Sequence, residues 1–176
     1  KRDARLVLVS RTESKLIELT NFINNSGGTA MYVVADVSNE LDCIKIIEKT
    51  VDEYGTIDIL LNNAGISMRA LFDDLKLSVF DKIMQVNFYG TLYCTKHALK
   101  YILKNRGSVV GVSSIAGYKG LPARTAYSAS KFALRGFLEA LRIENLKRGL
   151  HVLIASPGFT VSEIRNKALN STGEIQ

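Results

Sequence analysis

The nine residues Ile57-Asp58-Ile59-Leu60-Leu61-Asn62-Asn63-Ala64-Gly65 decide the fold, because they join a short apolar run directly to a polar turn. The run Ile57–Leu61 is long enough for a buried β-strand, and Asn62–Gly65 has the composition of a turn. Four other short apolar runs have the same character. Each of them predicts a strand, and they cover Arg5–Ser10, Ala30–Ala35, Gly107–Ser113 and Leu150–Ala155.

Segments with helical periodicity separate these strands. In Glu40–Tyr54, for example, Ile44, Ile47 and Val51 form one apolar stripe, and Gly55 ends the helix. The predicted helices cover Thr12–Asn25, Glu40–Tyr54, Val79 to about Leu103 with a bend near Gly90, and Ala126–Arg148. This alternation indicates an α/β fold in which helices wrap a doubly wound parallel sheet. We expect residues 1–176 to form a single domain of this kind.

Every predicted strand is followed by polar or glycine-containing residues. These segments are Ser10–Arg11, Asp36, Asn62–Gly65, Ser113–Ser114 and Pro157–Gly158. In an open parallel sheet, ligands bind at the carboxyl ends of the strands. The sequence therefore predicts one binding site to which all of these segments contribute.

The composition excludes several classes of protein. Apolar residues make up 47% of the 176 residues, which is too many for a disordered chain. The net charge of +6 comes from scattered Lys and Arg residues without interleaved aromatic side chains, so we expect no nucleic-acid partner. No apolar run approaches the ~20 residues of a membrane-spanning helix.

The two cysteines, Cys43 and Cys94, lack the spacing of metal ligands, and no metal site is expected. They are typical of reduced packing residues in a cytoplasmic protein. The sequence starts at Lys1 rather than Met, so the cytoplasmic assignment leaves an upstream targeting or anchor segment open.

Tyr127 and Lys131 are four residues apart in the helical stretch Ala126-Tyr127-Ser128-Ala129-Ser130-Lys131-Phe132, so they share one helix face. A cation beside a phenol favours the phenolate and lowers its pKa from the usual value of about 10. Tyr127 is therefore a candidate general acid or base. The alternative is an ordinary amphipathic helix with Tyr127 buried and Lys131 solvated.

Together with other segments, this pair resembles the short-chain dehydrogenase/reductase family in its single-domain form. The spacings agree, with 27 residues from Asn87 to Ser114 and 13 from Ser114 to Tyr127. The matching residues are Asn62–Gly65, Asn87, Ser114, Tyr127, Lys131 and Pro157–Gly158. The resemblance covers essentially the whole chain, and it implies a Rossmann-like oxidoreductase that binds a nicotinamide cofactor.

The resemblance implies a role for each member of the catalytic set. Tyr127 would exchange a proton with the carbonyl or alcohol oxygen, and Lys131 would lower the pKa of Tyr127 and bind the nicotinamide ribose. Ser114 would hydrogen-bond the substrate oxygen. Asn87 would lie in a mid-helix irregularity and hold a water that links Lys131 to solvent. Two alternatives stay open: Ser113 replaces Ser114, or Asn87 merely bonds neighbouring backbone.

Ser10 and Arg11 end the first strand, where an acidic residue would bind the ribose 2′-hydroxyl of NAD. Arg11 can bind a 2′-phosphate and Ser10 can donate to it, so NADP(H) is expected ahead of NAD. Alternatively, Arg11 is a solvated surface residue and Ser10 caps a helix. The resemblance adds cofactor contacts at Asp36, Val37, Asn63, Ala64, Gly65, Pro157, Gly158, Thr160 and Ser162, although a branched apolar residue is usual at Thr160.

The apolar or aromatic candidates for the substrate pocket favour a hydrophobic carbonyl compound or alcohol, with ordinary core packing as the alternative. They are Met68, Tyr118, Leu121 and Phe159. The resemblance also implies a homodimer or homotetramer that pairs through the two long helices. Candidate residues for that contact are Tyr93, His97, Tyr101, Phe137 and Leu141, and His97 otherwise has a structural role.

The main functional hypothesis is an oxidoreductase that moves a hydride between NADP(H) and a carbonyl or alcohol. One alternative is a catalytically silent regulator that senses NADP. Another is an epimerase or dehydratase on the same scaffold, which would show no net consumption of the cofactor.

The family's first strand, its Gly-rich turn and its last strand have no counterpart in this sequence. The first family strand lies between those represented by Arg5–Ser10 and Ile57–Leu61. We therefore expect a hole in the sheet about two strand spacings wide, roughly 9–10 Å. Backbone groups along its edges would be unpaired, which is costly. For this reason we expect the sequence to be a fragment, or the ordered part, of a longer chain.

Overall fold

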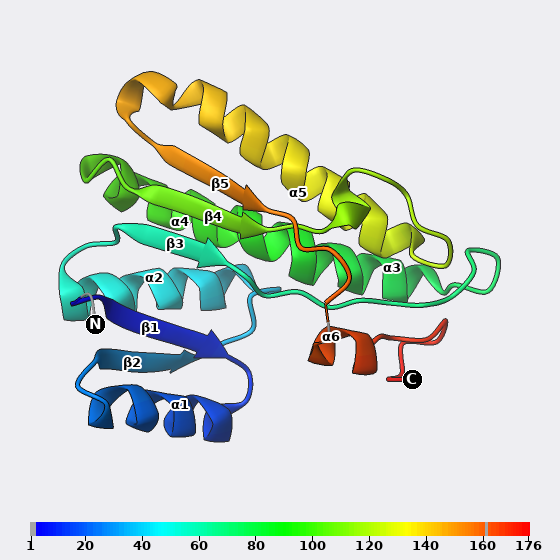
Figure 1. The fold of residues 1–176 in the computed structure, drawn as a ribbon, viewed down its shortest axis with the longest axis horizontal. Coiled ribbons are helices and arrows are strands. Elements are labelled where there is room, and N and C mark those ends of the chain that lie inside the picture. Colours follow the sequence, from blue (N-terminus) through cyan, green and yellow to red (C-terminus); the bar gives the residue numbers. More distant parts are fainter. Residues whose placement is uncertain (1–2, 161) are drawn as a thin grey trace.

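Strands and helices alternate along the chain in the computed structural model, which describes residues 3–160 and 162–176 (Figure 1). All the predicted strands are present, with bounds within two residues of those expected. They are β1 (Arg5–Ser10), β2 (Thr29–Val34), β3 (Ile59–Asn62), β4 (Ser108–Val112) and β5 (His151–Ala155). The helices are α1 (Glu13–Asn25), α2 (Glu40–Tyr54), α3 (Leu77–Met84), α4 (Gly90–Lys104), α5 (Thr125–Glu144) and the short α6 (Glu163–Asn166).

The helix predicted from Val79 to Leu103 is interrupted, as expected, close to Gly90. A π-helical segment, η1 (Gln85–Tyr89), joins α3 to α4 and buries the side chain of Asn87. Gly90 then starts α4, where a Cβ would lie 2.9 Å from Val37 Cγ2. Only a residue without a side chain lets α4 approach the loop after β2 this closely.

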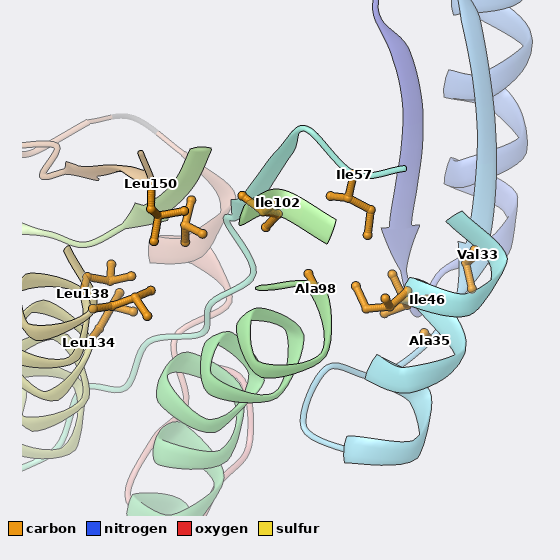
Figure 2. Packing of buried hydrophobic residues seen from close by; sticks show 12 residues of the cluster. Val33, Ala35, Ile46, Ile57, Ala98, Ile102, Leu134, Leu138 and Leu150 are labelled. Atoms are coloured by element: carbon orange, nitrogen blue, oxygen red, sulfur yellow. The ribbon is translucent and has the colours of Figure 1, made fainter. Parts of the chain in front are cut away.

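One face of the sheet carries the main hydrophobic core. Figure 2 shows this cluster extending from Leu134 and Leu138 of α5 past Ala98 and Ile102 of α4 to Ile46 of α2. Val33 of β2, Val109 of β4 and Leu150 complete it from the sheet side. The helices α2, α4 and α5 therefore pack with strands from both sides of the sheet, β2 and β4, in one core.

The opposite face of the sheet is covered only in part by the described residues. There α1 packs against β1 and β2, and Asn24 of α1 exchanges two hydrogen bonds with the backbone of Ala30. Over the other strands, Ile59, Leu61 and Leu153 leave 66%, 59% and 59% of their surface exposed. These large apolar side chains, on β3 and β5 at either side of β4, form an apolar surface where a packing layer would normally lie.

The sheet is divided into two parts. β1 pairs in parallel with β2, and β3, β4 and β5 form a separate parallel sheet with β4 in the centre. A cavity of about 730 Å³ lies between β1 and β3 and is also lined by residues of α2 and α4. The interruption expected between these strands is thus confirmed, and their facing edges have no strand partner among the described residues.

We predict opposite effects on stability for alanine at two glycines that lie on or under α5. A Cβ on Gly111 of β4 would overlap Leu138 Cδ1, whereas a Cβ on Gly136 of α5 would meet no atom within 4 Å. Gly111→Ala should therefore destabilise the protein by about 1–3 kcal/mol through overpacking. Gly136→Ala should stabilise it by up to ~1 kcal/mol through helix propensity. Urea unfolding of both variants tests this, and equal changes would contradict the close packing of α5 on β4.

Candidate active site

Tyr127 and Lys131 lie together on α5, as their spacing predicts. Lys131 Nζ is 5.7 Å from the centre of the Tyr127 ring. The Lys131 side chain is only 3% exposed, so the solvated lysine of the alternative interpretation is absent. Its ammonium donates a hydrogen bond of 2.8 Å to the carbonyl of Val112 at the end of β4.

Burial determines the protonation of Lys131. Removal from water disfavours the ammonium form and lowers the pKa of Lys131 to about 8. No carboxylate pairs with this group among the described residues. The site thus holds a cation that can lose its proton within about one pH unit of neutrality.

Asn87 connects three segments of the site. Its amide accepts a hydrogen bond from Ile66 N (2.8 Å) and donates one to Ile66 O (3.0 Å). It also donates to Ser130 Oγ (3.0 Å), and Ser130 in turn donates to the carbonyl of Tyr127 (2.7 Å). Because its partners lie at least 21 residues away, Asn87 does not simply bond its neighbouring backbone. Ile66 and Ser130 carry no sequence signal that pointed to this role.

Gly65 keeps the space above Lys131 open. A Cβ at this position would lie 3.4 Å from Asn87 Oδ1 and 3.6 Å from Lys131 Nζ. Any larger side chain would therefore cover both polar groups. Gly65 follows Asn63 and Ala64, which are exposed at the end of β3 and line the cavity beside β1.

The two serines after β4 have different surroundings. Ser113 is 4% exposed, and its hydroxyl has no hydrogen-bond partner among the described residues. Ser114 is half-buried, and its Oγ accepts a hydrogen bond of 3.2 Å from Ala116 N. Ser114 is therefore the more accessible of the two serines, in agreement with the choice made from the spacing to Tyr127.

Arg11 and Asp36 meet at the ends of β1 and β2. Arg11 Nη1 lies 3.5 Å from Asp36 Oδ2, and both side chains are open to solvent. Burial by itself raises the pKa of Asp36, but hydrogen bonds from Ser38 and the charge of Arg11 outweigh it, and the net pKa is lowered. Ser10 Oγ accepts a hydrogen bond from Thr12 N (3.2 Å), but the N-cap of α1 is Thr12 and no side chain caps this helix, so Ser10 is not its cap.

The other predicted cofactor residues lie on loops at the same end of the sheet. Val37 contacts Gly90, and its carbonyl accepts a hydrogen bond from Cys43 Sγ (3.3 Å). The carbonyl of Pro157 accepts a bond from Ile115 N, which ties the loop after β5 to the loop after β4. Gly158, Thr160 and Ser162 are exposed.

The predicted substrate residues differ in accessibility. Met68 is fully buried in a second hydrophobic cluster with Ile83 and Leu169, so its side chain packs in the core. Phe159 and Tyr118 are 79% and 52% exposed, and the guanidinium of Arg135 lies 4.0 Å from the centre of the Tyr118 ring. Leu121 is half-buried.

The residues predicted for subunit pairing have several different partners within the chain. His97 Nε2 lies 2.9 Å from Glu40 Oε1, which joins α4 to α2. Tyr93 packs against Tyr89 and Phe137 against Phe88, whereas Leu141 is buried in the main core. Pairing of copies through α4 and α5 stays a prediction, and so does the cytoplasmic location.

Two further observations apply to residues 3–160 and 162–176, the part of the chain that the structure describes. None of the helices there is long and apolar enough to cross a membrane. No group of three or more His, Cys, Asp and Glu side chains is placed to hold a metal ion in the same part of the chain.

Comparison with known proteins agrees with this arrangement. The family model adh_short, described as short chain dehydrogenase, matches residues 1–172. The chain belongs to the short-chain dehydrogenase family. An 11-beta-hydroxysteroid dehydrogenase A of Arachis hypogaea is 38% identical over 178 residues, which cover 99% of this chain and 51% of that protein. The chain thus spans about half the length of the curated relatives it matches.

Solved structures of short-chain dehydrogenases share the fold. A gluconate 5-dehydrogenase from Burkholderia cenocepacia J2315 in complex with NADP and tartrate is 25% identical, with a TM-score of 0.86 over 92% of this chain and 64% of its own. An NAD+-bound xylitol dehydrogenase is 26% identical, with a TM-score of 0.84 over 89% and 61%. The predicted Rossmann-like α/β fold is confirmed.

We predict that Lys131→Met stabilises the cofactor-free protein at pH 7. The native pKa of about 8 is below the ordinary 10.5, so the native state binds the proton less tightly than the unfolded state. Stability of the wild type should rise between about pH 8 and 10.5, and below this range the buried charge opposes folding. Thermal unfolding from pH 6 to 10 should show a higher, flatter profile for Lys131→Met. The exposed Lys119→Met is the control, and an equal response of both variants would contradict the burial argument.

Proposed function

We propose that this chain is the catalytic part of an NADP(H)-dependent oxidoreductase that interconverts a carbonyl compound and an alcohol. The observation that carries the proposal is the position of the buried Lys131 ammonium, 5.7 Å from the centre of the Tyr127 ring and hydrogen-bonded to Val112 at the carboxyl end of β4. A phenol beside a buried cation is suited to accept and return a proton.

The residues at the strand ends fit a dinucleotide. Gly65 leaves open space beside Lys131 that a Cβ would fill, and Asn63 and Ala64 offer exposed backbone next to it. We propose that these residues hold the adenosine half of the cofactor with Asp36 and Val37, and that Lys131 and Tyr127 bind the nicotinamide ribose. The loop after β5 would contact the nicotinamide through Pro157, Gly158, Thr160 and Ser162. When bound, the nicotinamide supplies or accepts the hydride.

The protein's own contribution is the management of a proton. In the reductive direction, Tyr127 would donate its phenolic proton to the developing alkoxide oxygen, and Ser114 would donate a hydrogen bond to the same oxygen. The charge of Lys131 would stabilise the resulting phenolate. The proton would return through Lys131, whose pKa of about 8 allows it to gain and lose a proton near neutral pH.

Asn87 would support this proton return by holding the segments around Lys131 in place. Its amide fixes Ile66 and Ser130, which hold the backbone on both sides of Lys131. We propose that a water bound near Asn87 connects Lys131 to solvent. The hydrophobic part of the substrate would contact Tyr118, Leu121 and Phe159, whereas Met68 is too deeply buried to take part.

The choice of NADP over NAD rests on Arg11. Both cofactors occur in the similar solved structures, since the gluconate 5-dehydrogenase holds NADP and the xylitol dehydrogenase holds NAD+. In this chain an exposed guanidinium lies where the ribose 2′ position is expected, 3.5 Å from Asp36. A flexible, solvent-open ion pair is worth little by itself, so Arg11 can turn to a phosphate at small cost.

Tyr127→Phe should lower turnover at least a thousandfold and leave NADPH binding within about threefold. The loss follows because phenylalanine cannot donate the proton, while the ring still fills the same space. Steady-state kinetics with a panel of aldehydes, ketones and hydroxysteroids, together with NADPH fluorescence titration, measures both quantities in the complete protein. Tyr32→Phe on β2 is the matched control. Turnover that survives Tyr127→Phe would overturn the proposed mechanism, and NADPH binding by an inactive wild type would favour the regulator.

Arg11→Ala should raise the Kd for NADPH about tenfold or more and change that for NADH less than twofold. The expected difference is the loss of one charge-assisted contact to the 2′-phosphate, roughly 1.5 kcal/mol. Lys15→Ala, an exposed cation on α1, is the control for general charge effects. Equal weakening of both cofactors would show that Arg11 does not read the phosphate.

A further inference from the structure

Three chain segments meet beside Tyr127, and each carries an arginine. The backbone of Arg69 donates to Leu169 O (2.8 Å), and Leu169 N donates to Ser67 O (2.9 Å). Ala70 N donates to Ala123 O (3.2 Å), immediately before the first turn of α5. These contacts hold Arg69 and Arg124 close to α6, which contains Arg165. In Figure 1, α6 lies beyond the carboxyl ends of β3, β4 and β5, at the end of the sheet where the candidate site lies.

Arg124 is fixed, and it is three residues from Tyr127 at the start of α5. Its Nη1 donates to Ser67 Oγ (2.5 Å) and to Met68 O (2.7 Å). Its other two guanidinium nitrogens have no hydrogen-bond partner among the described residues. A planar guanidinium held on one side in this way is pre-organised to bind an oxyanion on the other.

The positive charge at this point is not neutralised within the described residues. The ion pairs there do not include Arg69, Arg124 or Arg165. Two acidic side chains nearby in the sequence have other partners. Glu163 forms an ion pair with Lys167 (3.2 Å), and Glu174 accepts hydrogen bonds from Asn170 and Thr172. Burial lowers the pKa of Arg124, the like charges of Arg69 and Arg165 lower it further, and Tyr127 raises it.

We propose that the substrate carries a carboxylate, which Arg124 binds directly and Arg69 and Arg165 attract, next to the carbonyl or alcohol held by Tyr127. This inference rests on the proposed oxidoreductase function and narrows its substrate class. A bound carboxylate would satisfy the free nitrogens of Arg124 and relieve the repulsion among three cations. The apolar Leu121 and Phe159 would then contact the part of the substrate between its two polar ends.

The test compares 4-carboxybenzaldehyde with its methyl ester, two aldehydes that differ in one charge. Binding to the NADPH-loaded complete protein is measured by calorimetry, and reduction is measured by the loss of NADPH absorbance. We expect the carboxylate to bind at least tenfold more tightly than the ester. The preference should shrink as salt is raised, since the arginines are partly exposed. It should shrink severalfold in the double variant Arg69→Gln/Arg165→Gln, which keeps Arg124, and disappear in Arg124→Gln.

The double variant changes two exposed side chains, so it keeps the inference testable if Arg124→Gln fails to fold. Its matched control is Lys147→Gln/Arg148→Gln, which removes the same charge from exposed positions in the short segment Leu146–Arg148 that precedes β5. Equal binding of acid and ester by the wild type, weak binding of both, or a preference that is undiminished in the double variant would overturn the carboxylate site. Reduction of either aldehyde would still support the oxidoreductase, whereas NADPH binding without reduction of these or the panel compounds would count against the proposed function alone.

Discussion

The buried ammonium of Lys131 is the constraint on which the rest of the site depends. This ammonium is 3% exposed and has one hydrogen-bond acceptor among the described residues, the carbonyl of Val112, so its burial lowers the stability of the fold. The π-helical segment turns Asn87 toward Ile66 and Ser130, and these bonds fix the loop and the helix around the lysine. Gly65 completes the arrangement by leaving the space above the ammonium free. Stability is thus given up at the position to which we assign the proton chemistry, a pattern common at functional sites.

The division of the sheet explains why the helices matter so much for the shape of this site. β1 and β3 do not pair. The part of the site at the end of β1, with Arg11, is therefore joined to the part around Lys131 through α2 and α4. Cys94 and Gly90 of α4 line the cavity between the strands, and Val37 packs on Gly90. The main core therefore does two things, since it stabilises the fold and sets the spacing between the two halves of the predicted cofactor site.

Local patterns in the sequence predict the parts of this structure that depend on near neighbours. The shared face of Tyr127 and Lys131 follows from spacing within one helix, and the alternation of strands and helices follows from the apolar pattern of each segment. Gly90 marks the bend in the long helix, whereas the irregularity at Asn87 is implied by the family resemblance. Ile57 was expected to start β3 but lies before it, although it is buried, because apolar character reports burial rather than hydrogen bonding. Met68 resembled a pocket residue for the same reason. The bonds of Asn87 to Ile66 and Ser130, and the gathering of Arg69, Arg124 and Arg165, join distant segments and have no local signal.

Lys131 and the three arginines of the site differ in how far they are exposed to solvent. Lys131 is almost fully buried, so its charge acts at short range and in a low dielectric, where it is little screened from the neighbouring Tyr127 ring. Arg124 is half-buried, and Arg69 and Arg165 are exposed, so their charge is screened and acts chiefly on a group that arrives from solvent. Because arginine keeps its proton at all ordinary pH values, these residues cannot compete with Tyr127 for the proton that the reaction moves. In the proposed function, the buried charge of Lys131 therefore supports proton transfer at one end of the substrate. The more exposed charges of the arginines anchor the other end.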